Sequence, residues 1–114
     1  MKRTRDEWEA LTQEYIEHCF RTETAPRVAA MARMLGMSRE GLTRRFTAEI
    51  GRSPADAFRG LQIQRAQELL TGTERTTGEI ACLAAFGSSR AFYRTFLRCV
   101  GVTPTEFRRR SRHA

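Results

Sequence analysis

Lysine is almost absent from this chain of 114 residues, in which 19 of the 20 basic residues are arginine. Cysteine and histidine are also scarce, and the three Cys and two His residues form no Cys-x-x-Cys pair or His-Cys cluster. These absences argue against a disulfide framework or a zinc site, so we expect the thiols to be packing or inert groups. No apolar run approaches the roughly 18 residues that span a membrane, and no apolar segment follows the first residues as in a secretory signal. We therefore expect a cytoplasmic protein.

The residue patterns of enzymes are missing as well. The sequence has no paired carboxylates in a plausible cleft, no Ser/His/Asp or Cys/His arrangement and no glycine-rich phosphate loop. We expect no catalytic residues, no metal ligands and no cofactor. A cysteine-based redox sensor using Cys82 or Cys99 is a minor alternative within this class.

The charge is strongly positive and unevenly placed. The formal net charge is +7, yet residues 1–24 contain four basic and six acidic residues, while residues 25–114 contain sixteen and seven. This distribution favours a polyanionic partner for the later part of the chain. Arginine binds phosphate or guanine in bidentate fashion where lysine cannot, although codon bias would explain the preference equally well.

Helical periodicity dominates the sequence, and no alternating run of β-branched residues predicts a strand. We expect an all-α protein of about seven helices. Capping boxes begin at Thr4, Thr76 and Thr103, and Pro26 suits the first turn of a second helix. Gly51 and Gly101 are expected to end helices in the left-handed conformation. The expected helices cover residues 5–21, 26–34, 39–50, 54–70, 77–84, 89–100 and a short segment from 104 that ends in a solvated or phosphate-directed arginine run at 108–112.

An internal repeat is the most informative feature. Shifting the chain by 50 residues places residues 38–54 on residues 88–104 with matching Ser, Arg, Phe, Gly and Pro positions. Each copy has a short helix, a glycine-containing turn and a capped second helix, which is the pattern of a helix-turn-helix. The second turn has one extra residue near Gly87. We predict a first lobe at 1–52, a connecting helix at 53–71 and a second lobe with a basic tail at 72–114.

The second helix of each unit carries the candidate DNA-binding residues, because this helix enters the major groove. Arg44 and Arg94 occupy the same position of the repeat, and each is suited to bidentate bonding with guanine. The candidates for base readout are Arg39, Glu40, Thr43, Arg44, Ser89, Arg90, Tyr93 and Arg94. The candidates for phosphate contact are Ser38, Arg45, Ser88 and Arg98.

The predicted connecting helix would be roughly 25 Å long. Together with the lobes at its ends, it could hold two recognition helices about one turn of B-DNA apart, near 34 Å. We therefore expect a monomer that reads two successive major grooves of double-stranded DNA. The alternative is a protein-interaction or RNA polymerase-tethering module whose basic face is incidental, in which case binding would depend little on salt.

The motifs resemble the DNA-binding domain of AraC/XylS-type transcription regulators. The resemblance rests on ARMLGMSREGLTRRF at 32–46, GRSP at 51–54, RAQELL at 65–70, Ile80-Ala81 and GVTPTEFR at 101–108. It implies a seven-helix, two-lobed domain that binds bacterial promoters in the nucleoid and contacts RNA polymerase. It also implies base contacts by Glu40, Thr43 and Arg44, and by Ser89, Arg90, Tyr93 and Arg94.

The sequence departs from the family pattern at several positions. The usual turn glycine is replaced in Ala85-Phe86-Gly87, so we expect its backbone role to shift by one residue or the turn to be distorted. A basic residue is usual at Gln62, and its loss is expected to weaken a phosphate contact. Most family members carry a ligand-binding or dimerisation domain ahead of this one. We expect a stand-alone regulator, with an excised fragment as the alternative.

Overall fold

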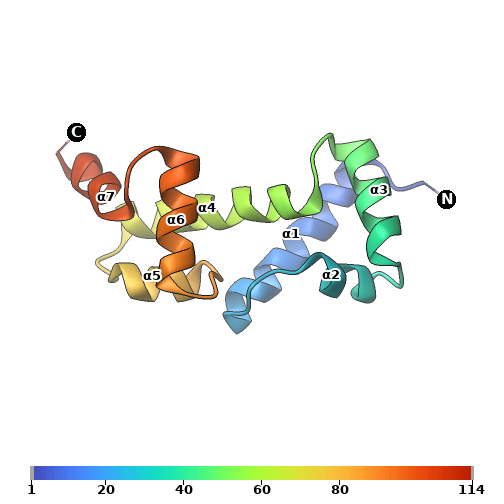
Figure 1. Ribbon diagram of the computed structural model, residues 1–114, viewed down its shortest axis with the longest axis horizontal. Coiled ribbons are helices and arrows are strands. Elements are labelled where there is room, and N and C mark those ends of the chain that lie inside the picture. The colour runs from blue at the N-terminus through green and yellow to red at the C-terminus, as the bar shows by residue number, and fades with distance from the viewer. Residues whose placement is uncertain (1, 114) are drawn as a thin grey trace.

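The computed structural model describes residues 2–113, and every regular segment in that range is a helix (Figure 1). The helices form two lobes that are joined by the long fourth helix, which confirms the predicted all-α architecture. Their bounds are α1 (Arg5–Thr22), α2 (Val28–Met34), α3 (Arg39–Ile50), α4 (Pro54–Gly72), α5 (Thr77–Leu83), α6 (Ser89–Val100) and α7 (Pro104–Arg112).

Side-chain caps begin six of the seven helices, at Thr or Ser residues. Thr4 and Thr76 form complete capping boxes with Glu7 and Glu79, as the sequence predicts. The third predicted box is only half formed. Thr103 accepts the backbone N–H of Glu106, but the Glu106 carboxylate accepts hydrogen bonds from the arginines of α7.

Two helix boundaries differ from those expected. α2 begins after Arg27, which leaves Pro26 outside the helix. The reason is that the hydroxyl of Tyr15 accepts the Arg27 N–H at 3.0 Å and holds Arg27 in an extended conformation. α4 passes through Thr71 and Gly72 and ends at Thr73, whose hydroxyl donates to the Leu69 carbonyl at 2.6 Å. A single Gly near a helix end costs too little to stop the helix.

Each lobe has its own core, and α4 contributes to both. In the first core, the Trp8 and Phe46 rings meet edge to face with centroids 5.7 Å apart, and α4 adds Phe58. In the second core, Phe92 of α6 packs against the rings of Phe86 and Phe96, and α4 adds Ile63, Ala66, Leu69 and Leu70. α4 packs against α1 and α3 in one lobe and against α5 and α7 in the other. The relative position of the lobes therefore depends on α4.

The turns of the two helix-turn-helix units use different residues for the same conformation. Gly36 has a φ of +66° in the first turn, and Ala85, 49 residues later, has a φ of +61° in the second. The expected one-residue shift of this role is wrong, since Ala85 itself has the positive φ and neither Phe86 nor Gly87 does. An alanine in this region is strained by about 1–2 kcal/mol. The methyl group of Ala85 is fully buried and joins the first core, so the strained residue also connects the lobes.

Gln62 of α4 is buried, with 6% of its surface exposed. Its side-chain nitrogen donates to the carbonyl oxygens of Ala84 and Ala85, at 3.3 and 2.9 Å. Those carbonyls lie just beyond α5, where backbone acceptors lack helical partners. The sequence-based interpretation of position 62 as a lost phosphate contact is therefore wrong, because this side chain points into the protein and fastens α4 to the second turn.

Replacing this side chain should loosen the attachment. We expect Gln62→Leu to lower the free energy of unfolding by about 1–3 kcal/mol, because it leaves buried carbonyls without a donor. Gln64→Leu, on the exposed side of the same helix, is the matched control and should change stability by less than about 0.5 kcal/mol. Urea denaturation followed by circular dichroism measures both. Equal midpoints for the two variants would contradict the assigned role.

Candidate nucleic-acid interface

α3 turns its apolar residues inward and its predicted reading residues outward. Leu42 and Phe46 are buried in the first core, which fixes the rotation of the helix. The opposite side exposes Arg39, Glu40 and Arg44, with Thr43 half-buried beside them. The structure therefore brings the four predicted residues of the first unit together on the accessible side of one helix.

α6 repeats this arrangement with one difference. Phe92 and Phe96 are buried, while Ser89, Arg90 and Arg94 are exposed. Tyr93 is 37% exposed, and its hydroxyl lies 2.8 Å from the hydroxyl of Thr105 in α7. The side chain of Tyr93 is thus held toward α7 by its hydroxyl, while part of its ring stays exposed.

The predicted phosphate-contacting residues lie at the helix starts and flanks. The Ser38 and Ser88 hydroxyls accept backbone N–H groups at 3.0 Å and so cap α3 and α6. Arg45 and Arg98 are exposed on the flanks of the same helices. Leu97, 48% exposed on α6, adds an apolar group to this surface at the position equivalent to Thr47.

The arginines of the two recognition helices are available for a partner. Within residues 2–113, six of them form neither a salt bridge nor a side-chain hydrogen bond: Arg39, Arg44, Arg45, Arg90, Arg94 and Arg98. Because no carboxylate competes for them, their guanidinium groups keep their full capacity for phosphate or base edges.

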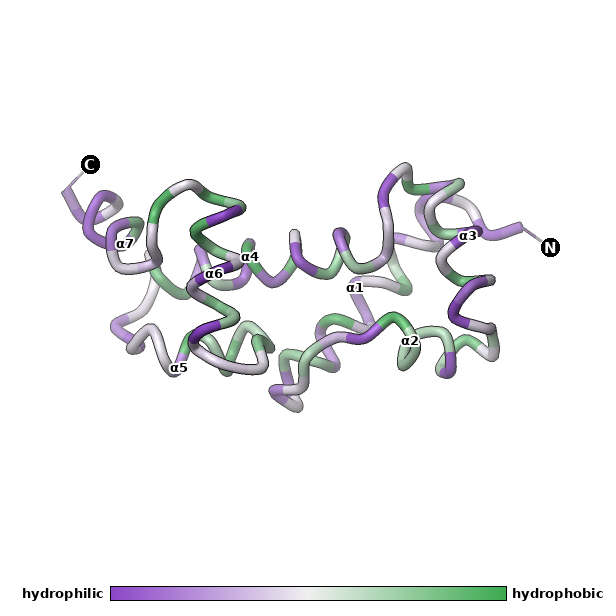
Figure 2. Tube along the Cα trace, viewed as in Figure 1, coloured by the Kyte–Doolittle hydropathy of each residue, from purple (hydrophilic) through white to green (hydrophobic). Residues whose placement is uncertain are grey.

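Three of the C-terminal arginines, Arg109, Arg110 and Arg112, are exposed, in keeping with the solvated run expected from the sequence, and Figure 2 shows most of α7 as hydrophilic. Arg108 donates to the carbonyl oxygens of Leu70 and Thr73 and so caps the end of α4. Arg109 and Arg110 bind Glu106, and hydrogen bonds from both guanidinium groups lower the pKa of its carboxyl to about 2. These residues are used within the protein.

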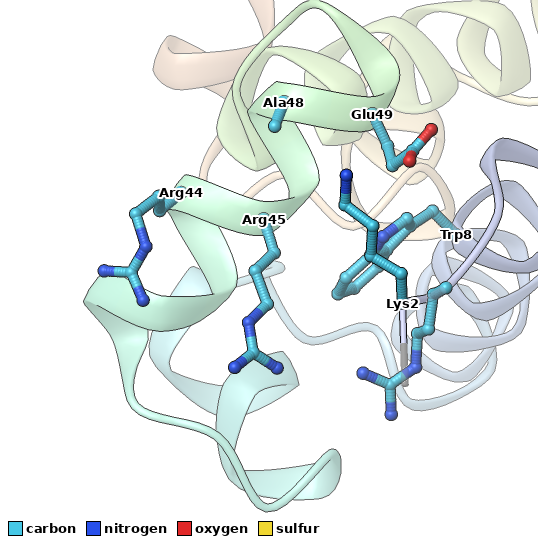
Figure 3. A pocket seen from close by; sticks show the side chains of 7 residues that line it. Lys2, Trp8, Arg44, Arg45, Ala48 and Glu49 are labelled. Carbon is cyan, nitrogen blue, oxygen red and sulfur yellow. The ribbon is translucent and has the colours of Figure 1, made fainter.

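Sequence reasoning missed two cations beside α3. Lys2 and Arg3 were counted with the acidic first segment, yet with Arg44 and Arg45 they line one cavity of about 340 Å³ (Figure 3). No sequence signal indicates this, because the two segments lie about forty residues apart and meet only in the folded structure, where Arg3 contacts Trp8 and Met37.

Residues 2–113 contain no group of three or more His, Cys, Asp or Glu side chains placed to share a metal ion. Over the same residues, no helix has both the length and the apolar character needed to cross a membrane.

Two capped recognition helices with unpaired arginines, each held by its own core and both attached to α4, define a DNA-binding module of the double helix-turn-helix class. Comparisons with known proteins place the chain further. A family model described as a helix-turn-helix domain matches residues 31–110. The regulator Rv1931c of Mycobacterium tuberculosis is 30% identical over 92 residues, which are 81% of this chain and 36% of that protein.

Solved structures of DNA-binding regulators have a similar fold. The DNA-binding domain of AdpA, crystallised with a target DNA, is 25% identical with a TM-score of 0.79, and the match covers 90% of this chain and 93% of that one. An AraC-type regulator from Chromobacterium violaceum is 26% identical with a TM-score of 0.73, covering 93% and 89%. The chain belongs to the AraC-type helix-turn-helix family of transcription regulators. It spans about a third or less of the length of the curated relatives it matches.

Proposed function

We propose that this chain binds promoter DNA as a monomer, with α3 and α6 in successive major grooves. The observation that carries the proposal is the placement of the two recognition helices, which both cross the long axis of the molecule, one toward each end (Figure 1). That axis measures 50 Å, so it accommodates two helices about 34 Å apart. We also propose that the first lobe ends at residue 52, that the connecting helix covers residues 53–71 and that the second lobe begins at residue 72.

The proposed roles follow the exposed faces. Arg44 and Arg94 read guanine O6 and N7, and their neighbours on the same helices read adjacent positions: Arg39, Glu40, Thr43, Ser89, Arg90 and Tyr93. Ser38, Arg45, Ser88 and Arg98 position the helices on the backbone. Because Ser38 and Ser88 are exposed, the backbone N–H groups at the start of α3 and α6 are accessible to a phosphate.

Selection of bound duplexes from random DNA tests the proposal most directly. A two-groove monomer should recover an asymmetric site about two turns long, protected on one face of the duplex. A protected site of one turn would refute the two-groove version. A palindromic site bound by two copies would refute the monomer.

Arg44 and Arg94 provide a residue-level prediction. Arg44→Ala and Arg94→Ala should each relax the preference at one base position by about 1–3 kcal/mol, at different places in the site. Arg109→Ala is the matched control, since Arg109 is occupied by Glu106, and it should leave the preference unchanged. Repeating the selection with each variant measures this. Uniform weakening on all sequences would instead make the residue a phosphate contact.

A contact with RNA polymerase is the second candidate function. The observation that favours it is the acidic exposed surface of α1, which includes Asp6, Glu14 and Glu17 and would repel DNA. A protein partner on that surface would leave α3 and α6 free. Binding to purified polymerase without DNA tests this, and its loss on changing Glu14 and Glu17 to Gln would support it. Location on the cytoplasmic nucleoid follows from the proposed DNA binding.

A further inference from the structure

The segment before α1 lies against the first recognition unit. The guanidinium carbon of Arg3 lies 5.1 Å from the ring centroid of Trp8, in a cation–π arrangement. Its Nη1 lies 3.5 Å from the sulfur of Met37, the residue just before the Ser38 cap of α3. Trp8 itself is 1% exposed, so the residue that holds Arg3 is fixed in the first core. Arg3 is therefore held at the end of α3 that enters the groove.

Lys2 extends this contact along α3. It lines the cavity of about 340 Å³ with Arg3, Trp8 and the α3 residues Arg44, Arg45, Ala48 and Glu49. Figure 3 shows Arg44 and Arg45 projecting from α3, with the Lys2 side chain in front of Trp8 and its amine end toward Glu49. Four cations and one carboxylate therefore surround an open space beside the recognition helix.

We propose that Lys2, Arg3 and Arg45 bind the DNA sugar-phosphate backbone on the outer side of α3, extending the contact beyond the first major groove. This inference rests on the proposed DNA binding and deepens it. A helix in the major groove, which is about 12 Å wide, has a phosphate strand along each side. Cations fixed beside such a helix meet one of these strands without further movement.

The position of residues 2–3 in the molecule determines which phosphates of the DNA they contact. Figure 1 shows the chain leaving α1 past α3, at the end of the molecule opposite α7. The contacted phosphates therefore lie outside the two-groove site, on the α3 side. At the other end, Arg109 and Arg110 pair with Glu106, and Arg112 pairs with Glu74. The proposed footprint is longer at the α3 end than at the α6 end.

The test uses the full chain and a duplex of about four turns (roughly 40 bp) that carries the selected site. Lys2→Ala/Arg3→Ala should make the slope of log affinity against log salt shallower by about two, and weaken binding roughly tenfold or more at 0.1 M salt. Hydroxyl-radical protection should be lost only at the α3 end. Arg5→Ala/Arg21→Ala removes the same charge from exposed positions of α1 and should leave both readings unchanged.

Lys2→Ala alone avoids the Arg3–Trp8 contact and should make the slope shallower by about one. Suppose that the native chain protects its site, and that Lys2→Ala and Lys2→Ala/Arg3→Ala both keep the native salt slope and the full footprint. This inference is then overturned, while the proposed function stands. If the native chain recovers no site from random DNA, the proposed function fails and this inference fails with it.

Discussion

Phe92→Ala should lower the free energy of unfolding by about 3–5 kcal/mol, the cost of removing a buried aromatic ring that leaves a cavity. Phe92 is fully buried, and its ring contacts those of Phe86 and Phe96, with centroids 5.1 and 5.7 Å away. Phe92 belongs to the cluster of buried side chains that forms the second core, so its removal takes away contacts shared by α4, α5 and α6. Small domains are stable by only about 5–15 kcal/mol in total, and we expect the second lobe to be substantially unfolded in this variant.

Denaturation followed by circular dichroism measures the loss, and footprinting shows its consequence for binding. The protected region should shrink to about one turn, since α6 would no longer be held in place. Cys99→Ala is the control, because Cys99 is exposed on the same helix, and its midpoint should match that of the native chain. A midpoint for Phe92→Ala equal to that of the control would show that the second core does not hold α6.

Raising the salt concentration from 50 to 200 mM should weaken DNA binding by about a hundredfold. The reason is the number of cations that we propose for phosphate contact: Lys2, Arg3, Arg45 and Arg98. Four phosphate contacts give a slope of log affinity against log salt of about −3.5, because each contact releases a condensed counterion. Fluorescence anisotropy with a labelled duplex measures the slope.

The double variant Arg109→Ala/Arg110→Ala distinguishes the loss of a phosphate contact from a general loss of positive charge. Both guanidinium groups are already bound to Glu106, so their removal should leave the slope as it is although two charges are lost. A slope shallower than about −2 for the native chain would contradict a phosphate-dominated interface. It would then favour the protein-interaction alternative.

The sequence predicts the local features of this fold well. Thr4, Ser38, Ser53, Thr76 and Ser88 cap helices where expected, because a cap depends on a few neighbouring residues. The 50-residue repeat in the sequence predicts correctly which residues of α3 and α6 face the core. This works because apolar residues that recur with helical spacing lie on the buried side of an amphipathic helix.

What the sequence missed depends on contacts between distant segments. The bond from Gln62 to Ala85 crosses 23 residues of the sequence, and the bond from Arg108 to Leu70 crosses 38. Arg3 has acidic neighbours in the sequence, and its contacts with Trp8 and Met37 exist only once α1 packs on the first unit. Intrinsic preference favours glycine in the left-handed conformation of the second turn, but the structure has Ala85 there, with its methyl group packed in the first core.

The 19 residues of α4 run without interruption between the two lobes, so this helix sets their rotational phase as well as their distance. One residue added to an α-helix turns everything beyond it by about 100° and advances it by about 1.5 Å. One base pair turns B-DNA by only about 34°. In the proposed complex, a change in the length of α4 would turn α6 out of its groove. The spacing of the two half-sites is then set by the residue count of α4, while the bases within each half-site can change through the surfaces of α3 and α6.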